Sequence, residues 1–90
     1  MNEIRKIIVD VDEIIKRNVI EPPLDLSLIK HFDNQLIITY LFALGKNHMF
    51  VILQSNKKTI DKKDYLLLLS KIDSIYEILE KIYNIYHNCI

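Results

Sequence analysis

Ninety residues are enough for one domain around a single hydrophobic core, and half of them are apolar, which excludes a disordered chain. Twelve basic and twelve acidic residues cancel, so no net field draws the chain to nucleic acid or to an anionic membrane. The longest charge-free stretch, residues 34–45, is too short to span a bilayer, and a single cysteine excludes an intrachain disulfide. With no secretory pattern in the first ten residues, we expect a cytoplasmic single domain, residues 1–90, without a membrane partner.

The first predicted element is an amphipathic helix over residues 3–18. Apolar residues recur at helical spacing along residues 4–15. The charged residues fall on the opposite side, so we expect Asp10 and Asp12 to face solvent. The proline pair at 22–23 ends the helix, because a proline lacks an amide hydrogen and pushes the preceding residue away from helical angles.

A short second helix is predicted over residues 26–32. Asp25 precedes it and is suited to the N-cap position. A side-chain oxygen at that position accepts hydrogen bonds from the free amides of the first turn.

The middle of the chain contains its only glycine, Gly45, between two apolar runs. In one interpretation, residues 36–44 and 48–54 are antiparallel strands of a hairpin with Gly45 in the loop. In the other, residues 34–44 form a helix that ends at Gly45 with a positive φ. β-branched and aromatic residues dominate both runs, which favours the hairpin. Neither run alternates polar and apolar residues, so we expect both faces of the hairpin to be buried.

The last predicted element is a long helix that starts after Asp61, its N-cap, and continues to about residue 87. At about 1.5 Å per residue it is close to ~40 Å long. Asp64 lies in its first turn, where the helix dipole favours a carboxylate. Its apolar arc covers roughly 160° of the circumference, wider than the seam of a two-stranded coiled coil. We therefore expect both the hairpin and a second chain to cover it.

The predicted fold class is α+β: an N-terminal helix, a short helix, a two-stranded antiparallel hairpin and a long C-terminal helix. An all-α helical bundle is the alternative. The surplus apolar surface predicts a small non-catalytic interaction module, a homodimer or a subunit of a larger assembly, which associates through the hairpin and a coiled-coil-like face of the long helix. Tyrosines on that face support an interface, because tyrosine joins a large apolar ring to a polar tip. The predicted interface residues are Leu69, Ile72, Tyr76, Leu79, Tyr83 and Tyr86.

A lysine cluster gives the alternative function, a small nucleic-acid-binding regulator. Six basic and only two acidic residues lie between residues 26 and 63. Lysines and free amides at a helix start are suited to phosphate. The cluster lacks arginines and interleaved aromatic residues for base stacking, and it includes Asp61 and Asp64, so a nucleic-acid partner is not favoured. The lysines are Lys46, Lys57, Lys58, Lys62 and Lys63.

No pattern in the sequence indicates catalysis. A single glycine excludes a glycine-rich phosphate loop, and no Ser, Cys or Lys has the local context of an activated nucleophile. His87 and Cys89 are two soft metal ligands where a tetrahedral site needs four. We therefore predict that the protein is not an enzyme and uses no metal, no cofactor and no small-molecule substrate.

Overall fold

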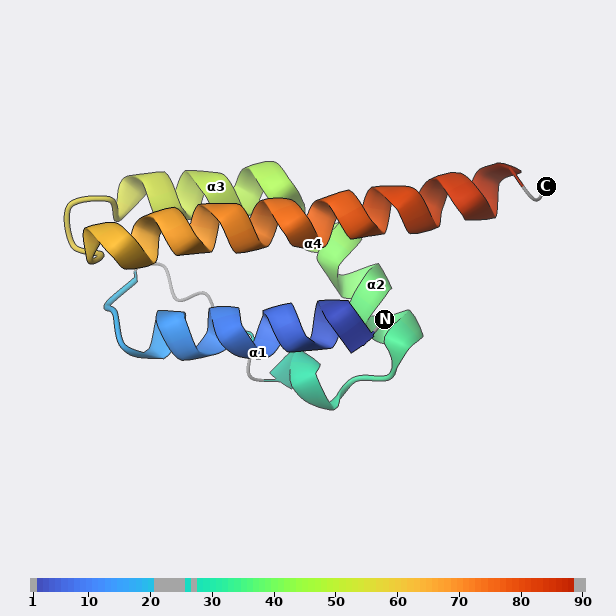
Figure 1. Cartoon of the computed structure of the whole chain (residues 1–90), viewed down its shortest axis with the longest axis horizontal. Coiled ribbons are helices and arrows are strands. Elements are labelled where there is room, and N and C mark those ends of the chain that lie inside the picture. Colours follow the sequence, from blue (N-terminus) through green and yellow to red (C-terminus); the bar gives the residue numbers. More distant parts are fainter. Residues whose placement is uncertain (1, 21–25, 27, 89–90) are drawn as a thin grey trace.

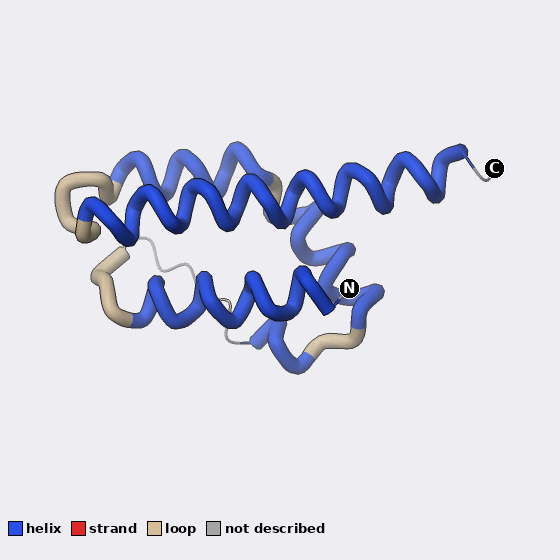
Figure 2. Tube along the Cα trace, in the orientation of Figure 1, coloured by secondary structure: helices blue, strands red, loops and turns tan. Residues whose placement is uncertain are grey.

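The computed structural model describes residues 2–20, 26 and 28–88, and for residues 2, 28, 30 and 85–88 it describes the backbone alone. This part of the chain is all-α (Figure 1). The tube drawn in Figure 2 contains helices and connecting loops, with no strand among the described residues. The elements are α1 (Asn2–Lys16), a short 3₁₀ helix η1 (Leu28–His31), α2 (Asn34–Leu44), α3 (Lys46–Ser55) and α4 (Lys62–Asn88).

Helix α4, with 27 residues, is the longest of the described helices. The molecule measures 45 × 23 × 20 Å. Both α1 and α3 run antiparallel beside the first part of α4 and pack against it (Figure 1). Helix α2 lies below the middle of α4, where it connects η1 to α3. The last part of α4 projects beyond the other helices (Figure 1).

The predicted hairpin is wrong, because residues 36–54 form α2 and α3. Their buried side chains follow helical spacing: Ile37 and Leu41 in α2, and Met49, Ile52 and Leu53 in α3. Strand propensity reflects how well side chains pack on a sheet, and here the packing of α3 against α4 and of α2 against α3 and η1 decides the outcome instead.

Gly45 is the break between α2 and α3, whose axes differ by 61°. Its φ of 84° and ψ of 139° belong to a region that glycine adopts readily and other residues rarely. Its amide donates to the carbonyl of Leu41 at 3.0 Å, and its carbonyl accepts from the amide of Met49 at 3.3 Å. A Cβ built on Gly45 meets no atom within 4 Å, so the backbone angle rather than space demands glycine here. The alternative sequence interpretation, a helix that ends at Gly45 with a positive φ, is the one that the structure shows.

Helix α1 is present, but one of its aspartates lies elsewhere than predicted. Asp12 is buried, with 2% of its surface exposed, and forms an ion pair with Lys16 at 3.1 Å. It was expected to face solvent. Helix α1 packs against both α4 and η1, so its buried arc is wider than its apolar residues alone indicate.

The N-cap of α4 is confirmed. Asp61 accepts from the amides of Lys63 at 3.1 Å and Asp64 at 3.4 Å. The apolar side of α4 forms the centre of the core, and four of its residues have no exposed surface: Leu68, Ile72, Ile75 and Leu79.

The predicted second helix is shorter than expected and is the 3₁₀ helix η1. Its proposed cap, Asp25, and the prolines at 22–23 lie outside the described residues.

Candidate interaction surface and pocket

Helix α2 has an exposed apolar surface. It buries Ile37 and Leu41, yet Leu36 is 51% exposed and Phe42 is 45% exposed. At 100° per residue, the outward side of α2 presents Phe42, Gln35, Thr39, Ala43, Leu36 and Tyr40 in that order, so two polar residues lie among four apolar ones. Large apolar side chains are normally covered by a core or by a partner. Within the described part of the chain, Leu36, Tyr40 and Phe42 remain partly exposed.

The projecting part of α4 adds to this surface. Exposure increases along the helix as it leaves the other helices: Leu79 is fully buried, whereas Tyr83 is 50% exposed. The ring of Tyr83 packs edge-on against that of Phe42, with centroids 6.1 Å apart and an interplanar angle of 63°. We call Leu36, Tyr40, Phe42, Ala43 and Tyr83 the α2–α4 surface.

A pocket of about 270 Å³ lies where α4 crosses the junction of α2 and α3. Its lining consists of Phe42, Lys46, Tyr76, Glu80 and Tyr83. A neighbouring pocket of about 250 Å³ shares three of these residues and adds Asp73 and Glu77. Two of the three tyrosines predicted for the interface, Tyr76 and Tyr83, therefore line one pocket. Its other wall, Phe42, was not predicted, because only the helical path of α2 brings it to α4.

Tyr76 fixes the junction of α2 and α3 to α4. Its hydroxyl donates to the carbonyl of Leu41 at 2.7 Å and lies 3.5 Å from the sulfur of Met49. Burial raises the pKa of Tyr76 to about 12, so the hydroxyl remains protonated at neutral pH. The carbonyl of Leu41 thus accepts from both Tyr76 and Gly45.

The structure separates the predicted interface residues into three groups. Ile72 and Leu79 are fully buried in the core of their own chain. Leu69 and Tyr76 are partly buried against that core. Tyr83 is exposed, whereas the side chain of Tyr86 lies outside the described residues. Within the part described, Tyr83 is the member of the predicted set with the most surface to offer a partner.

The structure divides the lysine cluster. Lys57, Lys58, Lys62 and Lys63 are exposed at the turn between α3 and α4 and at the start of α4. Lys46 lies at the other end of α3, forms an ion pair with Asp73, and places its ammonium 5.4 Å from the ring centroid of Phe50.

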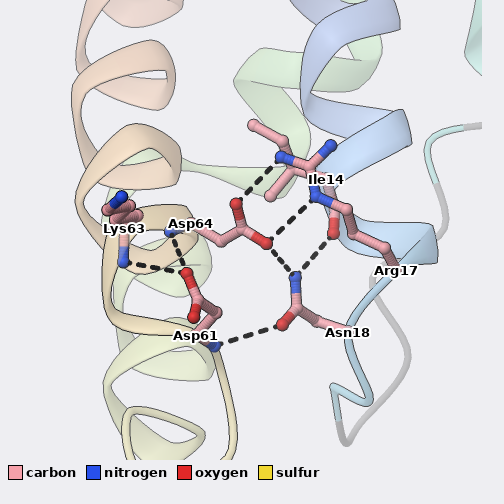
Figure 3. Close-up of polar contacts among 6 residues, drawn as sticks. All are labelled: Ile14, Arg17, Asn18, Asp61, Lys63 and Asp64. Atoms are coloured by element: carbon pink, nitrogen blue, oxygen red, sulfur yellow. Dashed lines mark hydrogen bonds and ion pairs between the residues drawn. The ribbon is translucent and has the colours of Figure 1, made fainter.

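A polar cluster joins the end of α1 to the start of α4 (Figure 3). The Asp64 carboxylate accepts from Arg17 Nε at 3.1 Å, Arg17 Nη2 at 2.9 Å and Asn18 Nδ2 at 2.8 Å. The side chain of Asn18 also donates to the carbonyl of Ile14 at 2.8 Å and accepts from the amide of Asp61 at 3.2 Å.

These bonds determine the charge state of Asp64, whose side chain is 12% exposed. Hydrogen bonds from Arg17 and then Asn18 lower the pKa of Asp64 to about 2, because they favour the charged carboxylate. Both of its carboxylate oxygens are engaged by Arg17 and Asn18, so we assign this cluster to the fold.

In the part of the chain that the structure describes, no three His, Cys, Asp or Glu side chains are close enough together to hold a metal ion. No single described helix is long and apolar enough to cross a membrane. Helices α2 and α3 together meet that length and composition test as a bent pair, and the core helices of proteins outside membranes also meet it.

No family model, curated protein or solved structure matches this chain. The fold and its surface define a class, a small helical protein with exposed apolar residues.

Proposed function

We propose that this chain is a non-catalytic interaction module that associates with a second copy of itself through the α2–α4 surface. The observation that carries the proposal is the exposure of large apolar side chains on α2 and the adjacent end of α4: among the described residues, Leu36, Phe42 and Tyr83 are each about half exposed. Exposed apolar surface that continues onto a neighbouring helix is typical of protein interfaces.

Three properties favour a second copy as the partner. The net charge of zero gives two copies no overall repulsion. A chain of ninety residues buries a modest fraction of its surface alone and gains stability from added contacts. Two-fold association would also use the same surface on both copies, so each exposed residue of that surface would be buried in both copies.

Leu36 gives a measure of the expected effect. Full burial of a leucine side chain contributes about 1.5–3 kcal/mol. Leu36 is 51% exposed, so covering its exposed half contributes about 1 kcal/mol per copy, or about 2 kcal/mol in a two-fold dimer. Replacing Leu36 with glutamine should therefore raise the dissociation constant of the dimer roughly 30-fold.

Sedimentation velocity over a wide range of protein concentration tests the proposal. Leu66→Gln is the matched control, because Leu66 is a similarly exposed leucine on the first part of α4, and glutamine and leucine have similar helix propensities. We expect a concentration-dependent dimer in the wild type and in Leu66→Gln, with a weaker dimer in Leu36→Gln. A chain that stays monomeric throughout would refute self-association. Equal weakening by both variants would refute the assignment to the α2–α4 surface.

A further inference from the structure

Three aromatic rings line the pocket at the crossing of α4 and α2. Phe42 comes from α2, and Tyr76 and Tyr83 come from α4. The hydroxyl of Tyr76 is engaged by the carbonyl of Leu41, which leaves its ring to line the pocket. Phe42 and Tyr83 are each about half exposed, so the pocket is open to solvent. Pockets for drug-sized ligands measure roughly 300–1,000 Å³, so a pocket of about 270 Å³ fits a smaller group.

The charges around this pocket favour a cation. The pocket itself is lined by one carboxylate, that of Glu80, and one ammonium, that of Lys46. Lys46 is neutralised by its ion pair with Asp73, and Glu77 in the adjoining pocket is paired with Lys81 at 4.0 Å. Three carboxylates and two ammonium groups leave a charge of −1. The faces of aromatic rings are also negative, so they add to the attraction for positive charge.

The same walls are unsuited to a metal ion, which needs several oxygen or nitrogen ligands in one place. The aromatic rings offer apolar contact, and Glu80 supplies one carboxylate at the edge. A cation that carries methyl groups satisfies both parts of the lining, since its methyl groups pack against the rings while its charge faces the carboxylate.

We propose that the pocket lined by Phe42, Tyr76, Tyr83, Glu80 and the Asp73-paired Lys46 binds a trimethylammonium group. The pocket is complete within one chain, so this inference goes beyond the proposed self-association and does not require it. The group can come from a small soluble molecule such as choline or from a trimethyllysine side chain of another protein.

Titrations of the full chain followed by NMR test the proposal with three probes. They are choline, its neutral isostere 3,3-dimethylbutanol, and a short uncharged peptide that contains one trimethyllysine. Protein concentration is kept low, because Phe42 and Tyr83 also belong to the α2–α4 surface. We expect choline to shift the ring resonances of Phe42, Tyr76 and Tyr83, and the isostere to bind roughly tenfold more weakly, as the loss of one cation–π contact predicts.

Variants connect the binding to named side chains. Glu80→Gln should weaken choline binding and leave the isostere unaffected, because it removes charge and keeps shape. Tyr83→Leu should weaken choline binding roughly tenfold. The control is Tyr40→Leu, which removes an exposed ring of α2 that does not line the pocket, and choline binding should be unchanged in it.

The outcomes separate this inference from the proposed function. At a protein concentration where the chain is monomeric, absence of choline and peptide binding, or equal binding of choline and the isostere, overturns the inference. Choline binding by a chain that stays monomeric over the whole concentration range of the sedimentation series supports the inference and refutes self-association. Tighter binding of the peptide than of choline identifies a protein side chain as the source of the group, and the reverse order identifies a small molecule.

Discussion

Replacing Gly45 with alanine should destabilise the protein through the backbone alone. The φ of 84° and ψ of 139° at Gly45 are a conformation that costs an L-residue about 1–3 kcal/mol. The added Cβ meets no atom within 4 Å, so no steric clash adds to this cost. Alanine also restricts the unfolded chain, which offsets about 0.4–1 kcal/mol. The midpoints of these two ranges give an expected net loss in the free energy of unfolding of about 1.3 kcal/mol.

Thermal and urea unfolding followed by circular dichroism measure this loss. In a domain of this size a change of 1 kcal/mol moves the melting temperature by about 4–8 °C. The matched variant is Ala43→Gly, which lies two residues earlier on the exposed side of α2. It should also lose stability, by about 1 kcal/mol, because glycine is a poor helix residue. Opposite substitutions at neighbouring positions should therefore both destabilise the protein.

One result would refute this reasoning. If the break at Gly45 were absent, residues 34–55 would form a continuous helix, in which alanine is favourable relative to glycine. Gly45→Ala would then be more stable than the wild type and more helical by circular dichroism. A stability equal to or above that of the wild type contradicts the bent arrangement of α2 and α3.

Three further predictions concern the packing around α4. Tyr76→Phe removes the hydrogen bond to Leu41 and should lower the free energy of unfolding by about 0.5–1.5 kcal/mol in urea titrations, while an unchanged value would contradict the observed bond. Because the pKa of Asp64 is lowered from 3.8 to about 2, its stabilising effect is complete above pH 3.8 and is lost as the pH falls toward 2. Asp64→Asn should therefore lose less stability than the wild type over that interval, and parallel pH profiles would show that the carboxylate contributes nothing. Ile72→Ala should cost about 2–5 kcal/mol in the monomer at high dilution, since Ile72 is fully buried, and a loss confined to the dimer would place it at the interface instead.

The sequence predicts well the helices that have one apolar side and one charged side. In α1 and α4, charged residues alternate with apolar ones at helical spacing, and the fully buried Ile8 and Ile75 fall on the expected side. In α2 the polar side is narrow, with Gln35 and Thr39 alone on the outward side among apolar residues, so the helical period is weak. Strand-forming residue types then suggested a hairpin. Asp33, which accepts from the amide of Leu36 at 2.8 Å, was the local sign of a helix start.

Only the part of the candidate site that lies on α4 could be predicted from the sequence. Tyr76 and Tyr83 belong to the apolar arc of α4 and are recognisable as interface candidates from the sequence. Their neighbours Phe42 and Lys46 reach them because α2 ends and α3 begins at the break at Gly45. That contact depends on backbone angles at one residue, which a hydrophobic pattern does not encode. The bonds from Arg17 to Asp64, 47 positions apart, were missed for a related reason, since only the packing of α1 on α4 brings them together.

Helix α2 is held at both ends, although its middle is exposed. A helix of eleven residues is marginal in isolation, so its stability comes from contacts at its ends and on its buried side. At its start, Arg5 donates to the carbonyl of Phe32 at 2.7 Å and to the side chain of Asn34 at 3.1 Å. At its end, the hydroxyl of Tyr76 holds the carbonyl of Leu41 at 2.7 Å.

This anchoring bears on how the α2–α4 surface would bind. Because both ends of α2 are fixed to other helices, Leu36 and Phe42 keep their positions before any partner arrives. Little conformational freedom then remains to be lost on association, which leaves more of the apolar contact as net affinity. The exposed apolar side chains of α2 are thus unfavourable for the isolated chain and suited to an interface. If the chain did not associate although α2 is held in place, their exposure would have no physical explanation.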